Sequence, residues 1–351
     1  MTAGWWLAAI LAAASEPEID LSGIWTFELD PEDRGVQERW FARSFSGRLR
    51  LPGSLQEQGF GDEVTPETKW TGSIVDRSYF TSPRFAKYRV PGNVKYPCWL
   101  QPRKTYVGPA WYQREVEVPA GWMGRRLELV LERPHWGTRV WLDEIEVGSA
   151  DSLSTPHWFD LGRSIPAGRH RLTIRVDNRL LVEVGVDAHS VCDHTQSNWN
   201  GIVGRLALVA RPAVWIEDIQ VYPDAGRRTA RVTVRVGNSV GASGRATLRL
   251  SARAPGSEAP AGAAGVELTT AGGVAEVDLP LGESALFWDE FNPVLHRLQV
   301  NLQADAGGMR FEDRAEVAFG LRTFCTEGTQ FTINGRKKAG ERSSAPPERT
   351  A

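Results

Sequence analysis

The sequence predicts an all-β protein. Glycine and proline are frequent, with 35 and 21 among the 351 residues, and no long helical period is visible. Short segments of alternating apolar and polar residues recur instead, with turn-forming residues between them, which is typical of antiparallel sheets. The apolar fraction of 41% argues against disorder, and the length predicts two to three domains. A net charge of −2 gives no electrostatic reason to expect a nucleic-acid partner or an anionic membrane surface.

The first segment, residues 1–15, is predicted to be a signal peptide. Residues 5–14 form an apolar run that is too short to span a bilayer, and the three alanines before Ser15 offer a cleavage site. No Lys or Arg precedes the run, so a buried strand or helix is the alternative. We expect export to the periplasm or the extracellular space. No other segment is long and apolar enough to cross a membrane.

The next segment, residues 20–212, is predicted to form a jelly-roll β-sandwich. Its first strand alternates Trp25 and Phe27 with Ile24 and Thr26. Later segments place apolar residues on one face with the same period, as at positions 172, 174 and 176 and at positions 206, 208 and 210. Between Pro66 and Pro109 the pattern gives way to a long aromatic stretch. Loops of this length are usually functional when they are ordered.

The composition changes near residue 213, and residues 213–322 are predicted to form an immunoglobulin-like sandwich. Thirteen of the fourteen tryptophans lie at or before Trp215. The later strands are simpler, with alternating apolar residues at 230–236, 246–252 and 298–304. A stretch rich in Gly, Ala and Pro, Ala254–Ala264, is predicted to be a loose loop. Residues 337–351 hold no apolar period and are predicted to be disordered.

Several blocks in fixed order resemble glycoside hydrolase family 2, the family of β-galactosidases, β-glucuronidases and β-mannosidases. The blocks of the first domain are Gly23–Trp25, Leu51–Ser54, Trp111–Arg114, Val140–Asp143, Ile174–Arg179 and Trp199–Arg205. Those that follow are the segment WDEFNPVLHRL from Trp288, then Phe319–Arg322 and Phe331–Arg336. One departure is the Asp143-Glu144 turn, where the family has Asn/Asp-Gly. The likeness spans about residues 20–336 and implies a sugar-binding jelly roll before an immunoglobulin-like domain.

The catalytic (β/α)8 barrel that the family carries next is absent from this sequence. A retaining glycosidase needs two carboxyl groups about 5 Å apart, and the family supplies them from the barrel, the acid/base as a Glu after an Asn. The sequence contains no Asn-Glu dipeptide. A barrel needs about 250 residues, whereas fifteen follow Arg336. Residues 323–336 therefore correspond to the start of a link to a missing barrel, and we predict no catalytic residue in this chain.

The candidate sugar contacts lie in one polar loop. Amides read hydroxyl groups and aromatic faces stack on sugar rings, and such residues crowd the segment 193–200. The candidates are Asp193, His194, Gln196, Asn198, Trp199 and Asn200. In the family a polar residue just before this tryptophan reaches the active site, which the resemblance carries to residues 196–198. The alternative is a hydrogen-bonded turn whose Trp199 packs on the core.

No metal or cofactor is predicted. His189, Asp193 and His194 could suggest a metal site, but such clusters are common on protein surfaces. Cys98, Cys192 and Cys325 are too few and too widely spaced for a disulfide framework or a metal motif, although an exported protein could pair Cys98 with Cys192.

The sequence therefore predicts a non-catalytic carbohydrate-binding portion of a family 2 β-glycosidase, whose partner is a β-glycoside or an oligosaccharide. An exported adhesion or scaffold module that binds a protein is the alternative, and an interrupted copy of a complete enzyme is a third reading. A missing barrel would also expose apolar surface and favour self-association. The residues expected there are Phe287, Trp288, Phe291, Phe324, Phe331 and Ile333.

Overall fold

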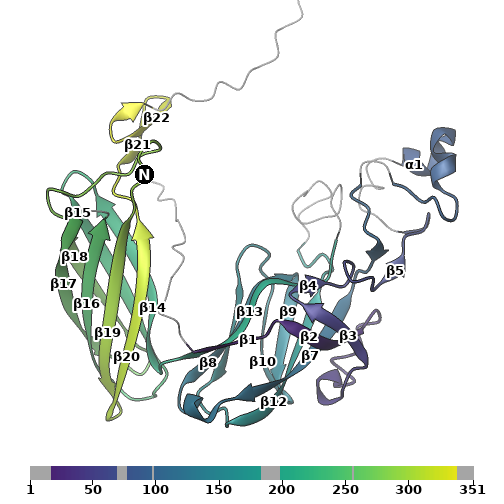
Figure 1. Cartoon of the computed structure of the whole chain (residues 1–351), viewed down its shortest axis with the longest axis horizontal. Coiled ribbons are helices and arrows are strands. Elements are labelled where there is room, and N and C mark those ends of the chain that lie inside the picture. The colour runs from purple at the N-terminus through teal and green to yellow at the C-terminus, as the bar shows by residue number, and fades with distance from the viewer. Residues whose placement is uncertain (1–16, 69–76, 97–98, 183–197, 255–256, 338–351) are drawn as a thin grey trace, which may run out of the picture. The chain divides into compact units, whose positions relative to one another are not determined.

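The computed structural model describes residues 17–68, 77–96, 99–182, 198–254 and 257–337. It divides the chain into two compact units, with the boundary between Arg211 and Pro212 (Figure 1). We call residues 17–211 the jelly-roll unit and residues 212–337 the immunoglobulin-like unit. The predicted fold class is confirmed, because both units are built from antiparallel sheets and the described residues contain no barrel. The predicted signal peptide, the 183–197 segment, Cys98 and Cys192 lie outside the described residues.

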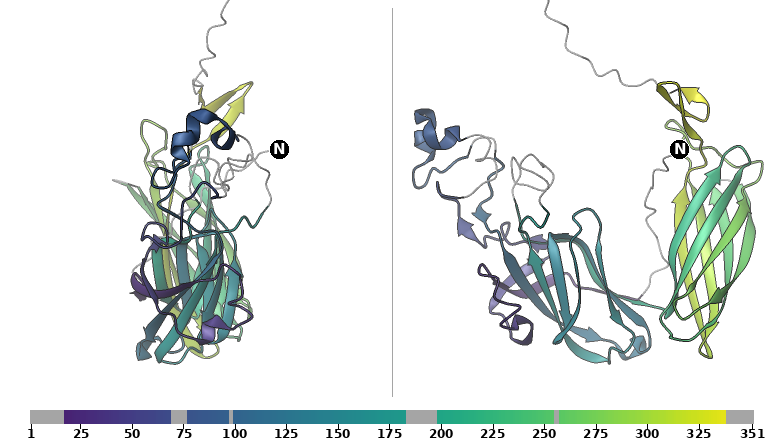
Figure 2. Two further views of the ribbon diagram at one scale, coloured as in Figure 1. Left: turned by 90° about the vertical axis from the view of Figure 1, so that its right-hand side faces the viewer. Right: turned by 180° about the vertical axis from the view of Figure 1, so that it is seen from behind.

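The jelly-roll unit packs two sheets against each other (Figure 2). One has the order β1-β13-β8-β11, with β4 also paired to β13; its strands are β1 (Glu18–Asp20), β4 (Gly53–Ser54), β8 (Arg126–His135), β11 (His157–Gly162) and β13 (Gly201–Arg211). The other has the order β10-β9-β12-β7-β2-β3; its strands are β2 (Gly23–Leu29), β3 (Gly47–Leu51), β7 (Pro109–Val118), β9 (Gly137–Leu142), β10 (Ile145–Ala150) and β12 (Gly168–Asp177). Short 3₁₀ turns, η1 (Trp40–Ala42) and η4 (Ala120–Trp122), join strands of this unit.

The core of this unit lies between the two sheets, where the predicted alternation places it. Trp25 and Phe27 are buried on one face of β2, while Ile24 on the other face is 55% exposed. The predicted apolar faces of β12 and β13 are also buried, at 172, 174 and 176 and at 206, 208 and 210. Every second side chain of these strands is buried, and for that reason the alternation of apolar and polar residues predicted the strands correctly.

The aromatic stretch predicted as a long loop forms a side lobe with an apolar cluster of its own. Its elements are β5 (Asp62–Glu63), α1 (Ser78–Thr81), η3 (Pro83–Tyr88) and β6 (Lys104–Thr105). The buried members of the cluster are Tyr79, Phe85, Tyr96 and Trp99. The Tyr96 hydroxyl donates a hydrogen bond to the Thr65 carbonyl at 2.8 Å, which joins the two halves of the lobe. The aromatic residues thus give this irregular segment a core.

Several strand ends meet at one end of the jelly-roll unit. In the antiparallel pair β12 and β7, Asp177 at the end of one strand faces Pro109 at the start of the other. In the pair β13 and β8, Gly201 likewise faces His135. The loops at this end contain residues 106–109, 177–182 and 198–201, so the predicted site residues that the structure describes lie here.

The immunoglobulin-like unit is also a sandwich. Its smaller sheet has the order β14-β15-β18, with strands β14 (Val214–Asp224), β15 (Thr229–Asn238) and β18 (Gly273–Pro280). Its larger sheet has the order β17-β16-β19-β20, with strands β16 (Gly244–Ala254), β17 (Ser257–Leu268), β19 (His296–Ala306) and β20 (Met309–Phe319). The alternating apolar residues predicted at 230–236, 246–252 and 298–304 are buried between the sheets.

The prediction of a loose loop over Ala254–Ala264 is wrong. Most of this stretch belongs to β17, which pairs along its length with β16 at the edge of the sheet, from Ser257 opposite Ala254 to Leu268 opposite Gly244. Backbone hydrogen bonds hold an edge strand in place and need no particular side chain, so small residues suffice once a neighbouring strand is present. Composition therefore misled the interpretation here.

Beyond the sandwich, residues 324–337 form a small three-stranded sheet whose outer aromatics are exposed. Its strands are β21 (Phe324–Glu327), β22 (Gln330–Ile333) and β23 (Arg336–Lys337). Phe324 and Phe331 stack with their centroids 5.3 Å apart and are 49% and 54% exposed. Phe291 is 73% exposed and Phe287 is 36% exposed, as predicted for this surface.

Two residues predicted on that surface are covered. Ile333 is only 3% exposed, so the expectation of an exposed side chain is wrong there: Ile333 lies at the end of β22 that is buried, next to the buried Thr332, whereas Gln330 and Phe331 at the other end are exposed. Trp288 is half-buried, and the Arg322 guanidinium lies over its ring at 4.4 Å. Lys337 belongs to β23, and the rest of the predicted tail lies outside the described residues. In the described part of the chain, no helix is long and apolar enough to span a membrane.

Replacing Ile174 tests the sandwich core of the jelly-roll unit. Ile174 lies on the central strand β12 and is fully buried, so Ile174→Ala should lower the free energy of unfolding by about 2–5 kcal/mol through lost burial and a cavity. Ile145→Ala on β10 of the same sheet is the matched control, because Ile145 is 75% exposed and its loss should change stability by less than about 0.5 kcal/mol. Urea denaturation of both variants measures the difference, and equal effects would contradict the assigned faces.

Candidate functional site

We call the end of the jelly-roll unit that contains residues 106–109, 177–182 and 198–201 the loop end. Asn200 lies there, at the centre of a cluster of buried amide groups that we call the amide cluster. Its side chain is fully buried, and its Nδ2 donates to the carbonyls of Gly108 at 2.9 Å and Val176 at 3.0 Å. Its Oδ1 accepts a 2.6 Å hydrogen bond from the Tyr112 hydroxyl. One side chain therefore joins the start of β7, the end of β12 and the start of β13.

The backbone of Asn200 extends the same cluster to a fourth segment. Its N–H donates to Gln56 Oε1 at 3.1 Å, and its carbonyl accepts from the Leu55 N–H at 2.9 Å. The next residue, Gly201, passes so close to the backbone at Gly53 that a Cβ would lie 2.3 Å from the Gly53 carbonyl oxygen. Only glycine fits there, which explains the Asn-Gly pair in the sequence.

Asn178 closes the loop that carries the predicted site. Its Nδ2 donates to Asn198 Oδ1 at 3.0 Å, and Asn198 Nδ2 donates back to the Asn178 carbonyl at 2.9 Å. Asn178 also accepts from the Gly108 N–H at 2.9 Å and donates to the Tyr106 carbonyl at 2.8 Å. The two ends of the 178–198 segment are thus held together and fixed to the exit of the side lobe.

Trp199 stacks on His135 at the outer edge of this cluster. The two rings are 4.7 Å apart with an interplanar angle of 19°, and both residues are half-buried. Nδ1 of His135 is 2.6 Å from the Trp199 carbonyl oxygen. Burial lowers the pKa of His135 and outweighs the opposing effect of this carbonyl, so the imidazole stays neutral near pH 7.

An ion cluster borders the same end. Asp177 bonds to Arg179, and Arg175 and Arg179 both reach Asp33 at 2.6 Å. Burial alone would raise the pKa of Asp177, but the hydrogen bonds and charges of Arg179 and Arg175 hold that pKa below its usual value. Because both carboxylates stay charged and paired, we assign this cluster a structural role in fixing the end of β12.

The predicted sugar-contacting residues that the structure describes differ in how exposed they are. Asn200 is buried and its amide is fully used within the protein, whereas Asn198 and Trp199 are half-buried and keep part of their surface open. Asp193, His194 and Gln196 lie outside the described residues, so their contacts with sugar stay predictions. Neighbours that the sequence did not single out are His135, Tyr106 and Gln56. Asn178 and Tyr112 stand inside the family-like blocks, which was the only sequence signal for them.

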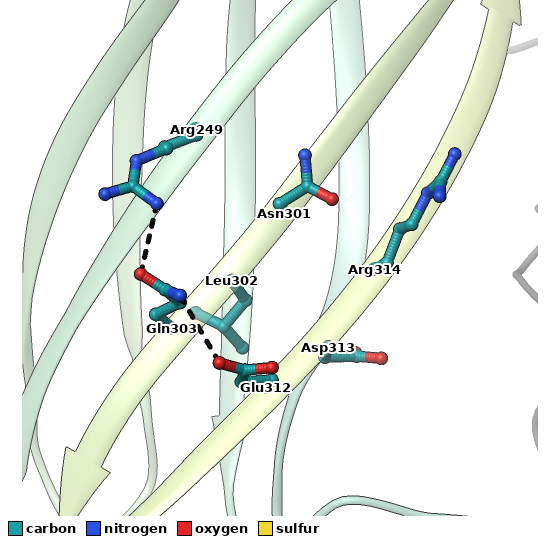
Figure 3. Close-up of a pocket in the computed structure, with 7 residues that line it drawn as sticks. All are labelled: Arg249, Asn301, Leu302, Gln303, Glu312, Asp313 and Arg314. Carbon is teal, nitrogen blue, oxygen red and sulfur yellow. Dashed lines mark hydrogen bonds between the residues drawn. The ribbon is translucent and has the colours of Figure 1, made fainter.

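Two surface hollows lie elsewhere. One, of about 510 Å³, is on the outer face of β16, β19 and β20 (Figure 3). There Arg249 donates to Gln303 at 3.1 Å and Gln303 donates to Glu312 at 3.3 Å, so the polar groups partly satisfy one another. The other, of about 810 Å³, is on the side lobe and contains Glu63, Glu67, Arg89 and Arg103 with aliphatic residues. Charges of both signs balance in each hollow, which gives no preference for a charged ligand.

The described carboxyl groups whose pKa is shifted are paired with hydrogen-bond donors or with arginines. A retaining mechanism needs one carboxyl whose pKa is raised so that it can donate a proton. Among the described residues, every carboxyl group with a shifted pKa has it lowered, by hydrogen bonds or by neighbouring arginines, as in Asp33 and Glu146. No group of three His, Cys, Asp or Glu side chains in the described part of the chain could hold a metal ion.

Comparison with known proteins shows which family this chain is similar to. Residues 71–212 match the family model described as glycosyl hydrolases family 2, sugar binding domain, and residues 214–322 match glycosyl hydrolases family 2. A β-glucuronidase of Paenibacillus borealis is 25% identical over an alignment of 336 positions that covers 91% of this chain and 47% of that protein. The β-glucuronidase of Felis catus is 23% identical over 90% of this chain and 46% of its own length.

Solved structures show the same fold. The Ruminococcus gnavus β-glucuronidase in complex with D-glucuronic acid superposes with a TM-score of 0.61 at 18% identity, covering 94% of this chain and 50% of that one. A β-glucuronidase from an uncultured Clostridium species superposes with a TM-score of 0.58, also at 18% identity, over 94% of this chain and 49% of its own. The chain thus spans about half the length of the relatives it matches.

Asn200→Ala tests the amide cluster. The change removes the acceptor of the buried Tyr112 hydroxyl and the donor to two carbonyls, so it should lower the free energy of unfolding by about 2–4 kcal/mol. Asn292→Ala on the exposed loop of the immunoglobulin-like unit is the control and should change stability by less than about 0.5 kcal/mol. Thermal and urea unfolding measure both. A neutral Asn200→Ala variant would show that the cluster does not hold this end together.

Proposed function

We propose, because the chain belongs to glycosyl hydrolases family 2, that its jelly-roll unit binds a β-glycoside or an oligosaccharide at the loop end and does not hydrolyse it. The observation that carries this proposal is the match of residues 71–212 to the sugar binding domain of that family. The same residues build the end of the unit at which the amide cluster and the half-buried Asn198 and Trp199 lie.

The geometry supports sugar binding at that end. Carbohydrate sites in proteins combine a rigid scaffold, an aromatic face for the C–H surface of the sugar and a few polar groups that fix its orientation. Trp199 supplies an aromatic face and Asn198 has one amide hydrogen that is not used by Asn178. Asn178 holds the side chain of Asn198 and His135 contacts the Trp199 carbonyl, which reduces the entropy that binding would otherwise cost.

We infer a β-glucuronide as the first ligand to test. The relatives named above are β-glucuronidases, and this chain resembles the N-terminal half of such proteins. Their hydrolytic activity belongs to proteins about twice as long, so cleavage by this chain is not part of the proposal.

We also propose that the protein is exported, and we name a rival to sugar binding. Export is proposed from the apolar run and the small residues at 5–14. An exported adhesion module that binds a protein is the rival function, since sandwiches of this kind serve both tasks. A test of binding to glycans distinguishes sugar binding from adhesion, because an adhesion module would bind its protein partner and would not bind sugars.

Trp199→Ala should weaken sugar binding about tenfold. Loss of an aromatic face removes on the order of 1–2 kcal/mol of apolar contact, and about 1.4 kcal/mol corresponds to a factor of ten. Asn198→Ala and Gln196→Ala should also weaken binding. Trp158→Ala is the matched control, because Trp158 is a 48% exposed tryptophan on β11 and not part of the loop end. Calorimetric titration with methyl β-D-glucuronide measures the affinities of the wild-type chain and the four variants.

The same titration decides between the functions. Unchanged affinity in Trp199→Ala, or equal losses in Trp158→Ala, would contradict the assigned site. No binding to a glycan array by the wild-type chain, together with capture of a defined protein partner, would favour the adhesion module. If the glucuronide were recovered as free sugar and aglycone, the proposal that this chain does not hydrolyse its ligand would be contradicted.

The exposed aromatics of the immunoglobulin-like unit should drive self-association. Phe324, Phe331 and Phe291 leave apolar surface at one end of this unit, tied together because Asn334 donates to the Trp288 carbonyl at 3.0 Å. The double variant Phe324→Ser and Phe331→Ser should shift sedimentation toward a monomer, because less apolar area is gained by association. Tyr222→Ser is the control, since Tyr222 is 40% exposed on β14 of the same unit. A wild-type chain that is already monomeric at high concentration would contradict this proposal.

A further inference from the structure

We propose that His135 is a sugar-contacting residue, and that its Nε2 accepts a hydrogen bond from a ring hydroxyl group of the glycoside bound beside Trp199. This inference rests on the proposed sugar-binding function and names a contact that the loop residues alone do not supply. It is carried by three features of His135: its tautomer, its free ring edge and its position.

The tautomer follows from the Trp199 carbonyl. A carbonyl oxygen can only accept, so the 2.6 Å contact requires that Nδ1 of His135 carries the proton. The neutral ring has one N–H, and Nε2 therefore holds a lone pair. Stacking on the Trp199 indole at 4.7 Å and 19° fixes the plane of the ring. The lone pair consequently has a defined direction before any ligand binds.

The ring edge that carries Nε2 is open. In the part of the chain that the structure describes, the buried side-chain nitrogen and oxygen atoms without a hydrogen-bond partner are Arg175 Nε and His296 Nδ1. His135 is half-buried, and within the described residues its hydrogen-bond partner is the Trp199 carbonyl, through Nδ1. Among the described residues Nε2 has no hydrogen-bond partner, and it is not one of the two buried unpaired atoms, so its lone pair is available to a ligand.

The position places this acceptor beside the other open groups of the site. His135 is the last residue of β8 and pairs across the sheet with Gly201, two residues after Trp199. The indole, the spare amide hydrogen of Asn198 and Nε2 of His135 thus lie at one strand end. They offer an aromatic surface, a donor and an acceptor, which is the set of groups that orients a sugar ring.

The acceptor discriminates between polar groups of a ligand. A hydroxyl group can donate to the lone pair of neutral His135, whereas a carboxylate is acceptor-only and would face it unfavourably. Burial lowers the pKa of this histidine, so the neutral form persists near pH 7. A glucuronide should therefore turn a hydroxyl group toward His135 and its carboxylate elsewhere.

A set of deoxy sugars tests this contact. We compare methyl β-D-glucuronide with its monodeoxy counterparts by calorimetry on the full chain and on His135→Phe, which keeps an aromatic ring for stacking on Trp199 and removes both nitrogens. One monodeoxy sugar should bind the wild-type chain about three- to tenfold more weakly than the parent, the effect of one lost hydrogen bond. In His135→Phe that same sugar should bind as well as the parent, while the other deoxy sugars keep their differences.

His170→Phe is the matched control. His170 lies near the start of β12, seven positions before Asp177 at the loop end, and bonds to Asp143 and the Pro166 carbonyl. It should show the wild-type pattern with every sugar. If His135→Phe keeps the wild-type pattern too, the contact is overturned while sugar binding stands. If the wild-type chain binds none of the sugars, the proposed function fails and the contact fails with it.

A second measurement does not depend on a folded variant. Histidine ¹⁵N spectra of the wild-type chain should show His135 as the Nδ1–H tautomer, and the Nε2 resonance should shift on saturation with methyl β-D-glucuronide. An Nε2–H tautomer in the free chain overturns the proposal. So does an Nε2 resonance that stays fixed while other resonances report bound sugar.

Discussion

The buried amide of Asn200 is the interaction on which the loop end of the jelly-roll unit depends. A fully buried carboxamide is costly unless its donors and acceptor find partners, and here they are met by Gly108, Val176 and Tyr112. Because those partners belong to different strands, the requirement to satisfy one side chain fixes three strand ends at once. Asn178 repeats the principle by joining residues 106–108 to residue 198.

The need to satisfy buried amide groups distinguishes the residues that hold the site in shape from the residues that remain available to a ligand. Asn200 and Asn178 are buried and use their polar groups within the protein, whereas Trp199, His135 and Asn198 are half-buried. A sugar site needs this arrangement, since polar groups that are held in place bind without a large loss of side-chain entropy. The family match to a sugar binding domain agrees with that division of roles.

Much of the fold could be predicted from the sequence, because a buried face at every second residue leaves its pattern in strands such as β12 and β15. The edge strand β17 could not, since its backbone pairing with β16 leaves no such pattern in a run of Gly, Ala and Pro. At the site, polarity marked residues 193–200 but not their roles. That Asn200 points inward, and that His135 stacks on Trp199 from 64 positions away, depends on tertiary packing.

Hydrogen exchange of three amides tests the central role of the cluster most directly. The N–H groups of Leu55, Gly108 and Asn200 each donate to a member of the cluster, although all three lie in loops or at strand ends. If the cluster holds this end as firmly as the sandwich core, these amides should exchange as slowly as that of Ile174 at the centre of β12. Exchange as fast as that of Gly162 N–H, which bonds to the exposed Asp160, would contradict the account.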